Sequence, residues 1–217
     1  MSKSICISMN QIQINPSPIQ KIEKPSKYLF TNEREPPKKD IELKAVELVS
    51  DLLKSICDKN ESKSMNLNQS IIKPFTTKTS PAISIKNYLM RITKFTKMEE
   101  STMILILIYI DRICNYNNIQ LTYKNIFKLI LASTIVAIKF NEDVHYSLEV
   151  YAKIGGVPPN ELEYLEFHFL ILIKFALNVD KTLYDKYSET LLSFQDDDFD
   201  EEEVCEEEEE KDDNKSM

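Results

Sequence analysis

Hydrophobic residues recur every three or four positions along most of this chain, which is the spacing that lines one face of an α-helix. The first periodic stretch covers 41–58 and follows Asp40, a residue type that often begins a helix. Further stretches with the same period follow at about 84–97, 99–115, 122–140, 147–154, 160–178 and 181–193. We therefore predict an all-α fold in which the five helices between 84 and 178 form the main bundle.

The third helix of this bundle is predicted to be its centre. It carries no charged residue from 129 to 138, so it should be buried on nearly all sides. In the second helix, the apolar run 103–110 taken alone could also be a buried strand. Glu99 and Glu100 precede this run, and acidic residues favour a helix N-terminus, so we predict a helix there as well.

The length of 217 residues allows one main domain with tails. Residues 1–40 contain five of the nine prolines and are expected to be a disordered arm. An amphipathic N-terminal helix at 41–58 and a polar linker at 59–80 should follow. The main domain and a C-terminal helix then occupy 81–193. The acidic tail, 194–217, should stay disordered because its charges repel one another.

The composition excludes several classes of protein. Only Gly155 and Gly156 are glycine, too few for a glycine-rich nucleotide loop or for the tight turns of an all-β fold. We expect Gly155 to end the helix before it in the left-handed conformation. The net charge is −8, but 196–217 hold 14 acids and two lysines, so the remainder carries +4. Its lysines are scattered, and we expect no nucleic-acid partner.

No membrane partner is expected either, because the longest apolar run is far shorter than the roughly 18 residues of a membrane span. The first ten residues lack the apolar core of a secretory signal. Four widely spaced cysteines without a CxxC pair are typical of reduced thiols. We therefore expect an intracellular protein of the nucleus, the cytoplasm or both.

Catalytic and metal-binding patterns are missing from the sequence. Its two histidines, His145 and His168, stand near no recognisable nucleophile motif, and no HxxxH or CxxC spacing occurs. We expect no enzymatic activity, no bound metal and no cofactor.

The informative residues are charged groups inside otherwise apolar helices. Asp111 and Arg112 end the run LILIYIDR. Lys139 closes LILASTIVAIKF, and Glu166 interrupts YLEFHFL. A charge at the margin of a buried helix costs free energy unless it is paired or meets a partner. Taken singly, each of these residues could also mark an ordinary amphipathic boundary, with Lys139 extending its amine to water.

Taken together and in order, YIDR (109–112), AIKFNED (137–143) and YLEFHFLILIKFALNV (164–179) resemble a cyclin box. The segments SPAISIKNYLMRITKFTK (80–97) and YAKIGGVPPNELEYLEFHFL (151–170) are similar to one branch, the P/U-type cyclins related to yeast phosphate-regulatory cyclins. The resemblance covers about 72–190.

The resemblance implies a five-helix cyclin box that binds a cyclin-dependent protein kinase as a heterodimer and activates it, in the cell cycle or the phosphate response. In that family, a lysine ending the third helix and a glutamate of the fifth contact backbone groups around the kinase C-helix. Lys139 and Glu166 match these positions. Asp111 is expected to be a structural charge that pairs with a nearby cation or caps a backbone group. Cell-cycle cyclins pair it with the arginine of an MRAIL motif, which the aligned PAISI (81–85) lacks.

A different interpretation stays open, namely a cyclin-fold adaptor in transcription or another assembly that binds no kinase. A fold does not by itself fix a function. Such adaptors usually carry two cyclin boxes and a zinc element, and the sequence shows neither. Capture of a kinase by the purified chain distinguishes the two interpretations.

Overall fold

The computed structural model describes residues 39–61 and 69–199. All regular structure in these two segments is helical and no strand occurs in them, which confirms the all-α prediction. The predicted arm before residue 39 and the acidic tail after residue 199 lie outside the described residues. The helices in chain order are α2 (Lys39–Glu61), α3 (Gln69–Ile72), η1 (Lys73–Phe75), α4 (Ile85–Thr96), α5 (Glu100–Asn117), α6 (Ile126–Asn141), α7 (Leu148–Gly155), α8 (Pro159–Leu172) and α9 (Lys181–Phe199).

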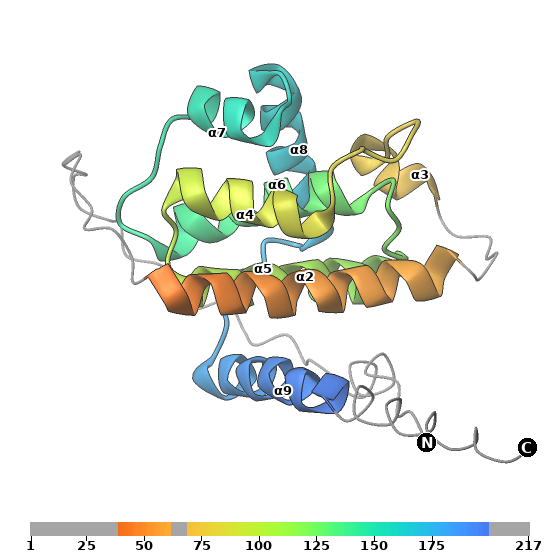
Figure 1. The fold of residues 1–217 in the computed structure, drawn as a ribbon. Helices are drawn as coiled ribbons and strands as arrows, with labels where there is room; N and C mark the ends of the chain where they lie inside the picture. Colours follow the sequence, from red (N-terminus) through yellow and green to blue (C-terminus); the bar gives the residue numbers. More distant parts are fainter. Residues whose placement is uncertain (1–38, 62–68, 200–217) are drawn as a thin grey trace, which may run out of the picture.

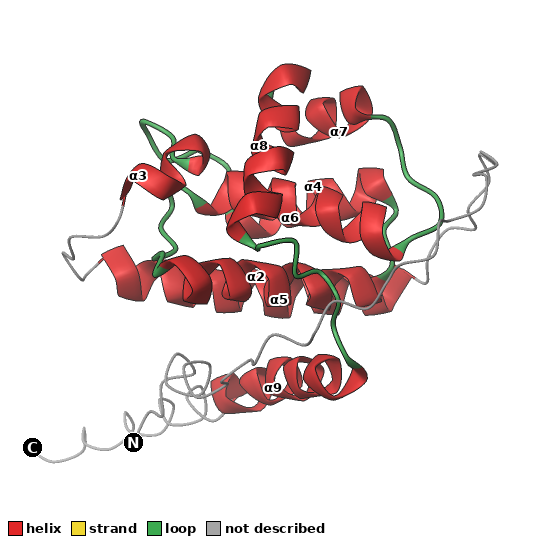
Figure 2. Ribbon diagram, turned by 180° about the vertical axis from the view of Figure 1, so that it is seen from behind, coloured by secondary structure: helices red, strands yellow, loops and turns green. Residues whose placement is uncertain are grey.

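The helices are stacked in tiers (Figure 1). In one tier α2 and α5 lie side by side, with α4 and α6 on one side of them and α9 on the opposite side. A further tier, formed by α7 and α8, lies beyond α4 and α6, as the reverse view also shows (Figure 2). The five helices predicted for the main bundle correspond to α4, α5, α6, α7 and α8.

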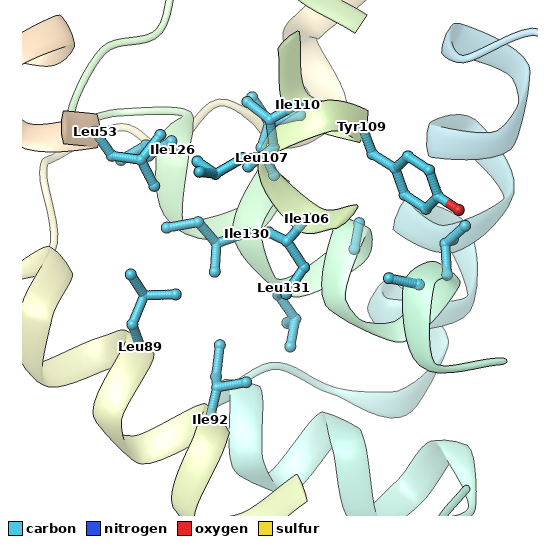
Figure 3. Close-up of a cluster of buried hydrophobic side chains, with 14 of the residues drawn as sticks. Leu53, Leu89, Ile92, Ile106, Leu107, Tyr109, Ile110, Ile126, Ile130 and Leu131 are labelled. Carbon is cyan, nitrogen blue, oxygen red and sulfur yellow. The ribbon is translucent and has the colours of Figure 1, made fainter. Parts of the chain in front are cut away.

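The uncharged stretch of α6 is the centre of the core. Each residue from Leu129 to Ile138 is at most 3% exposed, as the missing charges predicted. The hydroxyl groups of Ser133 and Thr134 both donate to the carbonyl of Ile130, so the buried hydroxyl groups of this segment are hydrogen-bonded within the helix. Burial of each large apolar side chain stabilises the fold by about 1.5–3 kcal/mol. Figure 3 shows side chains of α2, α4, α5 and α6 converging here, among them Leu53, Leu89, Ile92, Ile106, Leu107, Ile110, Ile126, Ile130 and Leu131.

Gly155 and Gly156 have different structural roles, and the prediction that Gly155 adopts the left-handed conformation was wrong. Gly156, with a φ of 74°, is the residue that ends α7 in the left-handed conformation. Gly155 is the last helical residue, and a Cβ at this position would overlap the buried side chain of Leu131. Its carbonyl accepts a hydrogen bond of 3.2 Å from the Tyr88 hydroxyl. Gly155 is therefore needed for close packing of α7 against α6 and α4.

Part of the segment predicted as a linker is folded. Within 59–80, α3 and η1 place Phe75 in the core, where its ring meets Phe169 of α8 edge to face at 6.4 Å. Ile72 and Phe75 are both buried, but this folded stretch is too short for a helical period to be recognised, which is why the sequence pattern missed it. The C-terminal helix is also longer than predicted, because α9 continues past residue 193 to Phe199.

Candidate functional site

The structure brings together Lys139 and Glu166, which are 27 residues apart in the sequence. Lys139 lies in the last turn of α6, and Glu166 lies in the middle of α8, which packs against α6. The Lys139 ammonium donates to both carboxylate oxygens of Glu166, at 2.7 and 2.8 Å. The side chains are 33% and 18% exposed, so the pair faces solvent from a partly sheltered position.

This ion pair has bonding capacity that the fold does not use. An ammonium has three donors and a carboxylate about four acceptor positions, and the pair uses only part of each. A pair open to water contributes only about 0–1 kcal/mol to stability. The two charged groups can therefore accept and donate further hydrogen bonds to a partner without loss of the fold.

Large apolar side chains are exposed on α8, just after it, and next to Lys139 at the end of α6. They are Phe140 (50% exposed), Tyr164 (52%), Phe167 (57%), Ile171 (48%) and Phe175 (65%), together called the α8 platform from here on. They make up five of the eleven large hydrophobic side chains that are exposed in the described residues. Clusters of exposed apolar side chains are typical of interaction sites.

The platform follows the geometry of α8. Tyr164, Phe167 and Ile171 are spaced by three and four residues, so they form one stripe opposite the buried seam of the helix. An open hollow of about 510 Å³ borders this stripe at Tyr164 and Phe167, and Glu166 and Leu170 also line it. Glu166 therefore lies at the edge of the same surface that Phe167 exposes.

The chain turns sharply at the end of α8. Lys174 and Phe175 both have a left-handed backbone, with φ values of 56° and 55°. For a residue with a Cβ, this conformation costs roughly 1–2 kcal/mol. Such a turn persists only where the surrounding structure holds it, and here it leaves the Phe175 ring exposed.

Three side chains of α5 hold this turn, and we call Tyr109, Arg112 and Asn117 the α5 clamp. Arg112 Nη1 donates to the carbonyls of Ala176 at 2.6 Å and Asn178 at 3.0 Å. The Tyr109 hydroxyl donates to the Leu177 carbonyl at 2.8 Å, and Asn117 Nδ2 donates to the last residue of α8, Leu172, at 3.0 Å. The clamp thus fixes the chain on both sides of Phe175.

The prediction that Asp111 pairs with a cation or caps a backbone group was wrong. Its Oδ2 accepts hydrogen bonds from two neutral side chains, Asn115 Nδ2 at 2.9 Å and the Tyr187 hydroxyl at 2.6 Å. Arg112, its neighbour in sequence, is bound to the carbonyls after α8, and Arg91 lies over the Tyr88 ring at 5.1 Å. Burial raises the pKa of Asp111, while the two hydrogen bonds and the Arg112 charge act in the opposite direction.

Sequence reasoning missed the α5 clamp and the exposed side of α8. The clamp has no periodic signal, since its targets are backbone carbonyls about 60 residues further along the chain. The stripe did have one, because Tyr164, Phe167 and Ile171 repeat at helical spacing outside the inward seam. A second apolar face on one helix indicates a second partner for that helix.

The structure gives two further observations about ligands and membranes. In the described segments, no group of three or more histidine, cysteine, aspartate or glutamate side chains is arranged to hold a metal ion. Among the described helices, none has both the length and the apolar character of a membrane span.

Comparison with known proteins gives a consistent result. The family model described as Cyclin matches residues 40–177, more than half of the chain. Cyclin-U4-2 of Arabidopsis thaliana is 32% identical over 157 residues, which cover 71% of this chain and 73% of that protein. Cyclin-P4-1 of Oryza sativa subsp. japonica is 30% identical over 155 residues, or 69% and 73% of the two chains. PHO85 cyclin-like protein psl1 of Schizosaccharomyces pombe is 32% identical over 164 residues, or 70% and 68%.

Proposed function

The chain belongs to the cyclin family, and on that premise we propose that it is the regulatory subunit of a cyclin-dependent protein kinase, which it binds as a heterodimer and activates. Cyclins are non-catalytic regulatory subunits, so the chain supplies no catalytic group. One similar protein is named a PHO85 cyclin-like protein, which favours a Pho85-type kinase as the partner. The output would be control of the cell cycle or of the phosphate response, in the nucleus, the cytoplasm or both.

The observation that carries the proposal is the Lys139–Glu166 pair set in the α8 platform. Interfaces that bind tightly combine exposed aromatic anchors with a few well-placed polar groups. Lys139 can donate to carbonyls of the kinase, and Glu166 can accept from its N–H groups, whatever side chains the kinase presents. Bonds to backbone groups fix the orientation of the kinase helix, while Phe140, Phe167 and the neighbouring platform residues supply apolar contact.

Activation then follows from holding one kinase element in place. A protein kinase is active when its own lysine–glutamate ion pair forms, and the position of the C-helix controls this pair. A rigid platform that covers the C-helix shifts the kinase towards the state in which the ion pair is formed. In this proposal the α5 clamp contributes by keeping Phe175, at the far end of the platform, in its exposed position.

The test measures capture and stimulation of a purified Pho85-type kinase by the full chain. The variant Lys139→Ala/Glu166→Ala removes the central pair. Loss of one hydrogen-bonding partner in an interface costs about 1–3 kcal/mol, so the dissociation constant should rise about tenfold or more. The stimulated kinase activity should fall in parallel.

The chain offers a matched control for this variant. Lys128 and Glu161 form another ion pair between the α6 and α8 helices, at 2.8 Å, outside the α8 platform. The variant Lys128→Ala/Glu161→Ala should bind the kinase as the wild type does. If both double variants bind equally well, the Lys139–Glu166 pair is not part of the interface. If the wild type captures no cyclin-dependent kinase at all, the adaptor interpretation replaces the proposal.

A further inference from the structure

A cleft of about 330 Å³ lies between the C-terminal halves of α2 and α5 and the connection 118–121. Its floor is apolar. Leu53 of α2 and Leu107 and Ile110 of α5, which lie near one another in Figure 3, form its buried base at no more than 5% exposed, and Ile56 of α2 is half-buried in its lining. Pockets that bind ligands have volumes of about 300–1,000 Å³, so the cleft is large enough for a few side chains. The α8 platform does not include any of these residues.

The rim of the cleft is polar and carries one charge. Its amide side chains belong to Asn60, Asn115, Asn118 and Gln120, and Asp111 is the only charged residue among the described residues of its lining. Amide groups both donate and accept hydrogen bonds, which suits an extended peptide backbone. Within 39–61 and 69–199, no lysine or arginine lines the cleft.

Asp111 is partly satisfied by the fold. Both of its hydrogen bonds, from Asn115 and Tyr187, end on Oδ2, and Oδ1 has no hydrogen bond within the described residues. The nearby guanidinium of Arg112 is occupied by the carbonyls of Ala176 and Asn178. Arg112 is close enough for its charge to act on Asp111 but makes no hydrogen bond to it. A carboxylate with acceptor capacity left at an apolar cleft is stabilised by a further cation that bonds to it directly.

We propose that this cleft is a docking site for a short extended segment of a partner protein, which places a lysine or arginine side chain at Asp111 and an apolar side chain against the half-buried Ile56. The charge complementarity selects a cationic segment, and the floor requires an apolar residue beside the cation. Asn60 and Asn115 each use an amide donor within the fold, to Leu121 and Asp111, and the remaining bonding capacity of the amide rim holds the backbone between the two side chains.

The proposed cleft and the α8 platform lie on different tiers of the molecule. α2 and α5 form the cleft, while α8 lies beyond α4 and α6 (Figures 1 and 2). One partner can therefore occupy the cleft while a kinase occupies the platform. The inference does not depend on the proposed kinase partner, and each can fail without the other.

The experiment displays a random library of seven-residue peptides to the full chain. The expected result is enrichment of peptides with a lysine or arginine next to a leucine, isoleucine or phenylalanine. An enriched peptide is then synthesised with a fluorescent label, and its dissociation constant is measured by anisotropy. Replacing its cation by the uncharged norleucine should weaken binding about tenfold or more, a test that does not alter the folded protein.

A variant of the chain provides the second arm. Asn115 is exposed, lies one turn from Asp111 and lines the cleft. In Asn115→Arg the new guanidinium competes for Asp111 and fills the cleft, so peptide binding should fall at least tenfold while kinase capture is unchanged. Asn87→Arg adds the same charge at an exposed position of α4 and should bind the peptide as the wild type does.

Three results would overturn the inference. The first is a library without enrichment, and the second is enrichment of peptides that carry no cation. The third is an enriched peptide that binds equally well after norleucine replacement, or equally well to Asn115→Arg and Asn87→Arg. If such a peptide is lost together with the kinase in Lys139→Ala/Glu166→Ala, it occupies the α8 platform instead.

Discussion

Removing the Arg112 side-chain charge should be among the most damaging single changes outside the apolar core. Arg112 is 5% exposed, and its Nη1 donates to two carbonyls after α8, at 2.6 and 3.0 Å. Met has a similar length, so Arg112→Met keeps the apolar packing and removes both bonds. Hydrogen bonds from a charged donor contribute about 1.5–3 kcal/mol each. The two bonds together therefore account for roughly 3–6 kcal/mol.

Part of this loss is offset. Arg112 Nε is buried without a hydrogen-bond partner, and the guanidinium charge is itself costly to bury. Met removes both penalties, so we expect a net loss of about 2–4 kcal/mol. Tyr109→Phe removes a neutral hydroxyl from the same α5 clamp and should cost only about 1 kcal/mol. We therefore also predict that Arg112→Met lowers the free energy of unfolding more than Tyr109→Phe does.

The assay is urea unfolding followed by circular dichroism, with the free energy of unfolding obtained by linear extrapolation. An unchanged slope with urea shows that the midpoint shift reports stability. The reasoning is refuted if Arg112→Met lies within about 0.5 kcal/mol of the wild type, the range of ordinary surface changes. It is equally refuted if Tyr109→Phe proves the more costly of the two.

Three other predictions concern stability. Gly155→Ala should cost about 1–3 kcal/mol because its Cβ overlaps Leu131, and a thermal melt like that of the wild type would contradict this packing. Phe75→Ala should lower the free energy of unfolding, measured with urea, by about 3–5 kcal/mol. If 59–80 were an unstructured linker, the same substitution would leave this free energy almost unchanged. Because burial raises the pKa of Asp111 above its ordinary 3.8, its protonation stabilises the folded state at low pH, and this contribution is lost as pH rises through the folded pKa. The free energy of unfolding of the wild type minus that of Asp111→Asn should therefore fall from acidic to neutral pH. If this difference rises instead, burial is not the dominant cause of the pKa shift.

The sequence contained enough information for the bundle because its signals are local and redundant. The uncharged stretch of α6 predicts a central helix from composition alone, and burial of every residue from Leu129 to Ile138 confirms it. The resemblance to P/U-type cyclins could also be recognised from the sequence, because it depends on long ordered motifs. The matched family and relatives confirm it. Phe75 was not predictable in this way, since its place in the core is set by Phe169, far along the chain.

The sequence was sufficient to identify the residues of the candidate site, but not the contact between them. Lys139 and Glu166 were singled out because each interrupts an apolar helix, but helical periodicity gives no distance between α6 and α8. Their direct ion pair is thus a result of the packing of these helices. The partners of Asp111 were predicted wrongly because Tyr187 lies on α9, which the five-helix bundle does not include. Side chains that bind distant carbonyls, as Arg112 does, leave no pattern in a single sequence.

The central claim is that a kinase covers the α8 platform. Hydrogen–deuterium exchange of the full chain, with and without a purified Pho85-type kinase, measures this directly. The account predicts slower exchange on binding in α8 and at the C-terminal end of α6, around Lys139, with exchange in α9 unchanged. Protection confined to α9 or α4, with α8 exchanging as it does in the unbound chain, would contradict it.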